Sequence, residues 1–213
     1  MTEKMLQKIS QQYVLTERDT QRLKVNGMQF RIRAFHAQGL GHVSVMTASG
    51  FFGLMKMDTL IINPIQRDMP LLSYDRVHAM GNDTLIYELY DTMLENVELA
   101  PIVRAKQNAA HLPDHDLGQH WYDSIKLGVS LSKKGKKGHT SAFDVAAMEY
   151  LTAYLQCAET AGCCAAVPKQ EKASVYVEGL LEHGGPSTDV FKKGIGIEKT
   201  TDLFRKVLFG THN

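Results

Sequence analysis

An aspartate inside an apolar stretch is the first residue of this sequence whose type and position could support chemistry. Asp75 lies in the segment 70–77 (PLLSYDRV), which is expected to form a central β-strand. A carboxylate in such a strand must be paired, face a cavity, or have its pKa shifted by desolvation. With a pKa raised towards neutrality, Asp75 could donate a proton to a bound substrate.

A structural explanation of Asp75 stands beside the catalytic one. The carboxylate could form a salt bridge with neighbouring Arg76, or its strand could lie at the edge of a sheet. Arg76 is a poor partner, because consecutive residues of a strand point to opposite faces. The residues alone leave both interpretations open.

Four lysines between residues 132 and 138 (SKKGKKG) form the second feature, and they are Lys133, Lys134, Lys136 and Lys137. They do not form a phosphate-binding loop, because the pattern G-x-x-x-x-G-K-[S/T] is matched nowhere in the chain. The simplest interpretation is a flexible, solvated charge run. The functional alternative is a docking site for an acidic protein, since clustered lysines raise the rate of encounter with such a partner.

Histidines and cysteines are present, but their spacing does not predict a metal site. The histidines at 111, 115, 120 and 139 fall in loops interrupted by Pro113, and no H-E-x-x-H pattern accompanies them. Cys157, Cys163 and Cys164 lack the C-x-x-C spacing and are interpreted as reduced thiols of a cytoplasmic protein. The sequence also lacks a G-x-S-x-G nucleophile elbow and a dinucleotide-binding G-x-G-x-x-G.

Length and charge exclude several classes of function. A chain of 213 residues is expected to form a single domain over 1–213, with a core large enough to fold without disulfides or metals. The formal net charge of +1 argues against general nucleic-acid binding, which requires a strong basic excess. No apolar run approaches the ~18 residues that span a bilayer, and no secretory signal precedes residue 22.

Hydrophobic patterning predicts the elements that must position Asp75. Residues 1–27 are expected to form an amphipathic N-terminal helix or arm. Four strands are predicted next, over 42–48, 51–63, 70–79 and 84–90, with a hairpin turn at 81–83. Because short turns join them, they predict an antiparallel meander rather than βαβ units.

The second half of the chain is predicted to be mainly helical. Helices are expected over 91–106, from a Ser141–Asp144 capping box to about 160, over 169–183, after Ser187, and over 198–209. One further strand is expected over 121–131. These elements predict an α/β protein with a central antiparallel sheet and helices on its faces.

Several segments of the chain resemble the ferredoxin-dependent bilin reductases. They are residues 63–77 (NPIQRDMPLLSYDRV), Leu112-Pro113 with 121–131, and a C-terminal region running from Gly185-Pro186-Ser187 to 202–209 (DLFRKVLF). Together they cover roughly residues 28–210, with matching order and spacing. The resemblance implies a three-layer α/β/α sandwich that holds a bilin between the sheet and the C-terminal helices.

The resemblance also implies a chemistry. Members of this family bind no metal or flavin, receive electrons singly from reduced ferredoxin, and protonate the bilin from carboxylates. Their strand aspartate corresponds to Asp75. Ferredoxins are acidic, so Lys133, Lys134, Lys136 and Lys137 are expected to contact this donor.

Three family positions differ in this chain. Members that form phycocyanobilin carry a histidine that would fall near Asp58 or Thr59, and a glutamate that would fall near Met46. An Asn or Asp of the C-terminal region would fall near Gly184, next to His183. We therefore expect a different site, in which Asp75 is helped by Asp58 or His183.

Three functions follow from these features. The first is ferredoxin-dependent reduction of a linear tetrapyrrole such as biliverdin. The second is a non-catalytic tetrapyrrole-binding protein with the same fold, because function depends on sites rather than folds. The third is an unrelated α/β interaction module.

Overall fold

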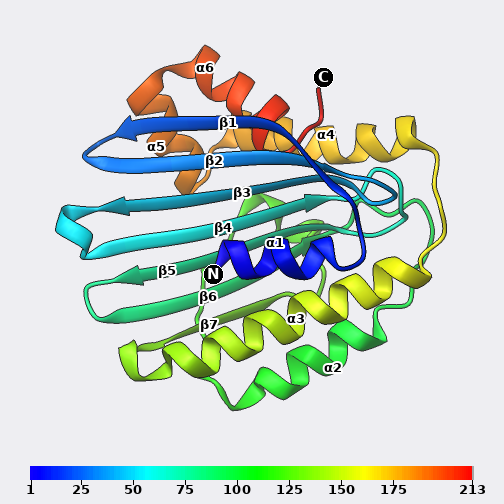
Figure 1. Ribbon diagram of the computed structural model, residues 1–213, viewed down its shortest axis with the longest axis horizontal. Coiled ribbons are helices and arrows are strands. Elements are labelled where there is room, and N and C mark those ends of the chain that lie inside the picture. The colour runs from blue at the N-terminus through cyan, green and yellow to red at the C-terminus, as the bar shows by residue number, and fades with distance from the viewer. Residues whose placement is uncertain (213) are drawn as a thin grey trace.

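Seven strands of the described chain form one antiparallel sheet in which sequence order and spatial order coincide (Figure 1). The computed structural model describes residues 1–212, and the side chains of all of them except Pro186. The strands are β1 (Leu15–Val25), β2 (Met28–Ala37), β3 (Gly41–Gly50), β4 (Met55–Asn63), β5 (Leu71–Ala79), β6 (Asn82–Tyr90) and β7 (Leu131–Lys136). The predicted antiparallel meander is therefore confirmed and extended by three strands.

Two of the hairpins in this sheet are closed by two-residue turns. Asn26-Gly27 joins β1 to β2 and Met80-Gly81 joins β5 to β6, and all four residues have positive φ angles. Such angles match the right-handed twist of hairpin strands. The second turn lies at Met80-Gly81 rather than at the expected residues 81–83.

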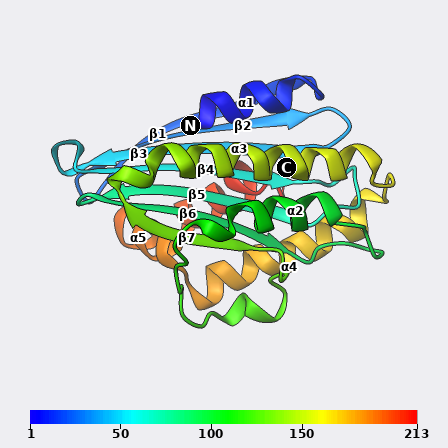
Figure 2. The ribbon, with the colours of Figure 1, turned by 90° about the horizontal axis from the view of Figure 1, so that it is seen from below.

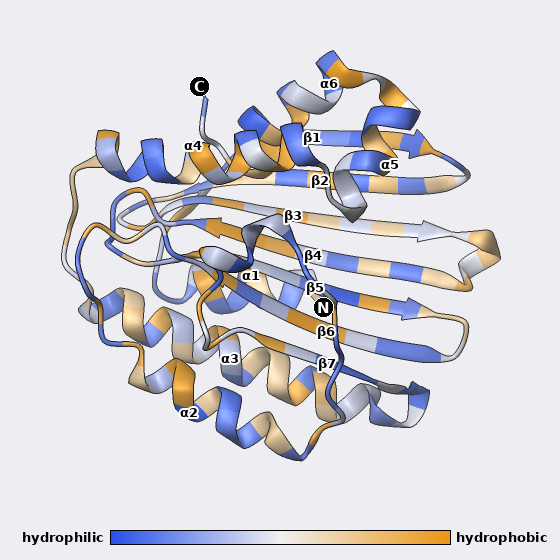
Figure 3. Ribbon diagram, turned by 180° about the vertical axis from the view of Figure 1, so that it is seen from behind, coloured by the Kyte–Doolittle hydropathy of each residue, from blue (hydrophilic) through white to orange (hydrophobic). Residues whose placement is uncertain are grey.

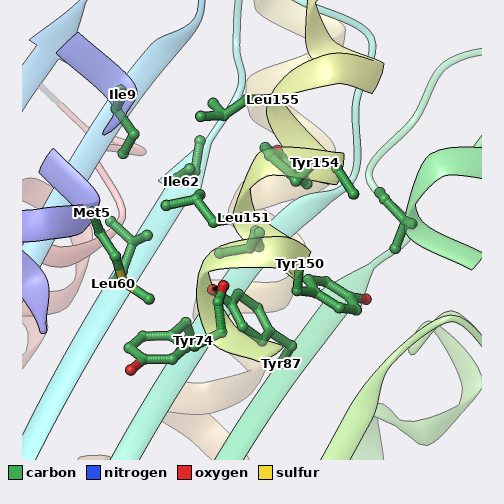
Figure 4. Packing of buried hydrophobic residues seen from close by; sticks show 14 of the residues in the cluster. Met5, Ile9, Leu60, Ile62, Tyr74, Tyr87, Tyr150, Leu151, Tyr154 and Leu155 are labelled. Atoms are coloured by element: carbon green, nitrogen blue, oxygen red, sulfur yellow. Dashed lines mark hydrogen bonds between the residues drawn. The ribbon is translucent and has the colours of Figure 1, made fainter. Parts of the chain in front are cut away.

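One face of the sheet is covered by α1 (Thr2–Ser10), α2 (Ala100–Asn108) and α3 (Thr140–Thr160). Figure 4 shows its core, in which side chains of α1 and α3 meet those of β4, β5 and β6. Tyr87 stacks on Tyr150 with ring centroids 4.3 Å apart. The Tyr87 hydroxyl donates to the Ala147 carbonyl oxygen at 2.8 Å, so the aromatic core leaves this polar group satisfied.

The other face is covered by α4 (Ala166–His183), α5 (Pro186–Ile195), α6 (Ile197–Asp202) and a π-helical turn over Leu203–Leu208. Sheet side chains hold the carbonyls of this last turn, because Ser44 Oγ donates to Leu208 O at 2.7 Å and Asn63 Nδ2 donates to Phe209 O at 2.9 Å. Figure 2 shows helices on both sides of the sheet. The three-layer α/β/α sandwich is confirmed.

The first two strands, β1 and β2, are not predicted by the sequence patterns. The patterns predict a helix or arm over residues 1–27. The helix covers only Thr2–Ser10, and the strands β1 and β2 follow it. Charged residues occupy many exposed positions of β1, because it is the edge strand and its neighbourhood is only partly covered by helices. Figure 3 shows hydrophilic and hydrophobic residues alternating along the strands.

Three predictions in the second half are wrong. The segment 121–131 begins with a 3₁₀ turn, Trp121–Ser124, and the strand β7 lies instead in the lysine-rich segment. The helix predicted over 91–106 begins only at Ala100. The Ser141–Asp144 capping box does not form, because α3 begins at Thr140 and the Asp144 carboxylate lies 3.5 Å from the Arg76 guanidinium.

Arg76 is fully buried on the α3 face and has a fully buried partner. Its Nη1 lies 2.6 Å from the Asp83 carboxylate, and Thr140 Oγ1 donates to the same carboxylate at 2.7 Å. The guanidinium also lies 4.9 Å from the centre of the Phe143 ring. Arg76 therefore points away from Asp75, as strand alternation predicted.

None of the described helices is long and apolar enough to cross a membrane.

Candidate functional site

A cavity of about 230 Å³ lies between the sheet and the C-terminal helices. Its floor comes from alternate residues of β3 to β6, which share one face because side chains along a strand alternate. In the sheet register Met46 pairs with Thr59, Thr59 with Asp75, and Asp75 with Ile86, so these four side chains form a row across the floor. The roof is mainly apolar and aromatic, and includes Tyr176, Leu180, Phe204, Leu208 and Phe209.

Asp75 lies on the cavity floor and is half-buried. Its Oδ1 accepts a hydrogen bond from Thr59 Oγ1 at 2.5 Å. Burial raises the pKa of Asp75 to about 6, the hydrogen bond from Thr59 opposes the shift, and the negative charge of Glu88 adds to it. A carboxyl group with such a pKa carries its proton in part of the molecules near neutral pH, so it can act as a general acid.

Glu88 is a second carboxylate on the same floor, and the sequence analysis missed it. It pairs in register with Ser73, one strand away from Asp75 on the same face. The Tyr90 hydroxyl donates to its Oε2 at 2.7 Å, whereas Oε1 is buried without a hydrogen-bond partner and lies 3.7 Å from Lys126 Nζ. The alternation of residues 84–90, in which Thr84, Ile86, Glu88 and Tyr90 share a face, was the signal that could have found it.

An aromatic wall closes one side of the cavity. His120 and Tyr122 come from the loop before β7, with their rings stacked at 4.9 Å. Tyr90 and Tyr176 stack at 4.0 Å beside them. Burial raises the pKa of Tyr122, which keeps its phenol neutral and able to donate a hydrogen bond. Flat, conjugated ligands suit a wall of this kind.

Asp58 and His183 do not line this cavity. The Asp58 side chain lies on the opposite face of the sheet, where its carboxylate is 3.7 Å from the amino group of Met1. His183 ends α4 with its side chain 53% exposed, and its ring lies 5.4 Å from the Trp121 ring. The expectation that either residue helps Asp75 is therefore corrected, and the position beside Asp75 belongs to Thr59.

The four lysines between residues 132 and 138 differ in their exposure to solvent. Lys133 is buried in β7, where Nζ donates to the Leu112 carbonyl oxygen at 2.9 Å and to the Asp114 carboxylate at 2.6 Å. It is a structural residue, and the expectation that it docks a partner is wrong. Lys134, Lys136 and Lys137 are exposed.

Within residues 1–212, no group of three or more His, Cys, Asp or Glu side chains is arranged to hold a metal ion. Cys157, Cys163 and Cys164 are free thiols.

No family model matches the sequence, and no curated protein matches it. Among solved structures, the fold is similar to that of phytochromobilin synthase from tomato in complex with biliverdin. The TM-score is 0.78, the match covers 99% of this chain and 82% of the tomato chain, and the sequences are 14% identical. This chain has the fold of a bilin reductase.

The comparison confirms the resemblance seen in the sequence at the level of the fold. The resemblance placed a bilin between the sheet and the C-terminal helices, and the cavity of this bilin-reductase fold lies there. On its floor Thr59 lies beside Asp75, and Met46 lies beside Thr59. These are the positions near which the resemblance places a histidine and a glutamate in other members.

Proposed function

We propose that this chain reduces a linear tetrapyrrole such as biliverdin, with ferredoxin as electron donor and Asp75 as proton donor. The observation that carries the proposal is a carboxyl group of raised pKa on the floor of an aromatic cavity, within a bilin-reductase fold. Tyr90, Tyr122 and Tyr176 line the cavity, and aromatic side chains of this kind suit the flat pyrrole rings.

Reduction of one double bond requires two electrons and two protons. The donor protein supplies the electrons one at a time, and is oxidised once for each. Asp75 transfers a proton to the bilin after the first electron arrives, when the pigment has gained negative charge and basicity. The resulting aspartate keeps the hydrogen bond from Thr59, which stabilises the charged form.

Glu88 is the group we assign to the second proton. Its Oε1 accepts no hydrogen bond from the protein and lies 3.7 Å from Lys126 Nζ, while the Tyr90 hydroxyl fixes the other oxygen. Asp75 and Glu88 line the same cavity, so both protons can reach one bound pigment.

The first test is a spectroscopic titration with biliverdin. A shifted and sharpened visible band at one pigment per chain is expected, together with quenching of the single tryptophan, Trp121, which packs beside Tyr122 at the cavity wall. Anaerobic addition of reduced ferredoxin should then bleach and shift the pigment band.

The same titration separates the alternatives. The absence of Glu and His from the floor at Met46 and Thr59 favours a non-catalytic tetrapyrrole-binding protein as second candidate. That protein would bind biliverdin without reducing it. An unchanged biliverdin spectrum would contradict both functions.

Turnover is expected to depend on pH through Asp75. The protonated acid is needed, so the single-turnover rate should fall as pH rises above about 6. In Thr59→Val the hydrogen bond that lowers the pKa is lost, so the pKa of Asp75 rises and the fall moves to higher pH. Rates measured from pH 5 to 9 on both proteins check this, and a shift to lower pH in the variant would contradict it.

Pigment binding is expected to move the cavity wall. Pockets for drug-sized ligands occupy roughly 300–1,000 Å³, whereas the cavity measures about 230 Å³, so a linear tetrapyrrole needs more room. The wall at 117–122 is loop and a short 3₁₀ turn, which rearranges more easily than the sheet floor. Amide exchange in 113–122 should change on adding biliverdin while β4 and β5 stay the same. Equal change in floor and wall would contradict a moving wall.

A further inference from the structure

The tips of two hairpins carry large apolar side chains that contact nothing in the core. Phe51, Phe52 and Leu54 at the β3–β4 tip are 57%, 109% and 66% exposed, and Met80 at the β5–β6 tip is 89% exposed. Phe51, Phe52 and Met80 also have positive φ angles, a conformation that favours glycine or asparagine. Neither burial nor turn geometry accounts for these residues, which we call the apolar cap.

The two tips of the apolar cap lie side by side and have lysines next to them. The Met80 amide donates to the Leu54 carbonyl oxygen at 3.4 Å, which joins the two tips. The Lys137 amide donates to the Gly81 carbonyl oxygen at 3.1 Å, which brings the end of β7 alongside. Exposed Lys56, Lys136 and Lys137 therefore border the cap.

The figures place these parts at one end of the molecule. Both hairpin tips and the end of β7 lie at the left of Figure 1, and the β3–β4 tip is coloured hydrophobic in Figure 3. Exposed apolar patches of this kind mark interaction sites.

The apolar cap is also close to the cavity. Met57 and Val77 line the cavity and lie three residues along their strands from Leu54 and Met80. At the rise of a β-strand, three residues span about 10 Å. A protein seated on the cap would therefore stand one short strand segment from the bound ligand.

We propose that the apolar cap is the docking surface for an acidic protein that donates single electrons. Carboxylates around the donor's redox centre would meet Lys56, Lys136 and Lys137, while Phe52 and Met80 would fill the apolar centre of the interface. This inference rests on the proposed function for its role, since only a reductase needs the donor. The sequence predicted that the donor contacts all four lysines between residues 132 and 138. The proposed surface instead comprises the two hairpin tips, Lys56, and the last two of those lysines.

The test measures docking separately from reduction. A plant-type [2Fe–2S] ferredoxin is titrated calorimetrically into the pigment-free wild type and into the Phe52→Ser/Met80→Ser variant. The dissociation constant is expected to rise about tenfold, the effect of losing one well-packed interface contact. Both side chains are exposed, so circular dichroism and thermal unfolding should be unchanged. Val167→Ser, 70% exposed at the start of α4, is the matched control and should bind ferredoxin normally.

A second variant tests the cationic border. Lys136→Glu/Lys137→Glu should weaken ferredoxin binding and flatten its dependence on salt, because attraction between exposed charges is screened. In turnover, both variants should raise KM for ferredoxin and leave the biliverdin spectrum as in the wild type.

The outcomes distinguish the two proposals. Wild-type affinity for ferredoxin in Phe52→Ser/Met80→Ser overturns the docking surface even if biliverdin is reduced. A missing biliverdin band overturns the proposed function, whatever the calorimetry shows. If the wild type sediments with phosphatidylserine vesicles and the variant does not, while ferredoxin binding is equal in both, the cap is a membrane contact and the docking proposal is overturned.

Discussion

Replacement of Asp75 by asparagine is expected to abolish reduction of biliverdin and to leave its binding intact. Asparagine has nearly the same shape and can still accept the hydrogen bond from Thr59, but it carries no acidic proton. Loss of a general acid typically costs 10²- to 10⁴-fold, so turnover should fall by roughly that factor. Anaerobic single-turnover absorbance with excess reduced ferredoxin measures the rate, and the pigment titration measures binding.

Two further variants accompany Asp75→Asn, one as its control and one as a test of the second proton donor. Asp58→Asn changes the neighbouring strand on the opposite face of the sheet and should retain wild-type turnover. Glu88→Gln should slow a later step and let a partly reduced pigment accumulate. Undiminished activity in Asp75→Asn would remove this residue from the mechanism, and equal losses in Asp58→Asn would point to a general structural effect.

Replacement of Asp83 by asparagine is expected to destabilise the protein by about 3–5 kcal/mol, the range for breaking a buried ion pair from one side. Arg76 and Asp83 are both 0% exposed and 2.6 Å apart, so the variant leaves a guanidinium buried without its close counter-charge. Urea unfolding monitored by circular dichroism should show a lower midpoint with an unchanged m value.

Asp144 provides the matched control for the ion pair. It also faces Arg76, but at 3.5 Å and with its side chain 41% exposed, so Asp144→Asn should cost about 1 kcal/mol or less. Equal losses in the two variants would show that Asp144 compensates Arg76 as strongly as Asp83 does.

The middle of the sheet could be predicted because its strands are covered on both faces and bounded by turn residues. The strands β3 to β6 have buried apolar residues on the α3 face and a cavity-lining row on the other. The edge strands could not be recognised in the same way. β1 is largely polar, and β7 consists of lysines, serine and glycine after Leu131, so neither shows the apolar alternation on which strand prediction depends.

Asp75 could be identified from the sequence because it is a single charged residue in an apolar strand. The choice between Asp58 and Thr59 as its neighbour depended on the register between strands, which sequence patterns do not specify. The structure pairs Thr59 with Asp75 directly. Glu88 shares a strand face with Ile86 and Tyr90, so alternation could have indicated it. His120 reaches the cavity from a loop, so only the assembled tertiary structure brings it to the site.

The meander order of the sheet has a consequence for synthesis on the ribosome. Each strand pairs with the strand before it in the chain, so strand pairing can proceed as the chain emerges. Only β7 must wait until α2 has also been synthesised. The cavity roof, however, belongs to residues after 165. Until these leave the ribosome, the apolar face formed by Phe30, Ile32, Met46 and Ile61 has no cover. The nascent chain is thus most prone to aggregation just before its last helices appear, when a chaperone that shields apolar surface would benefit it most.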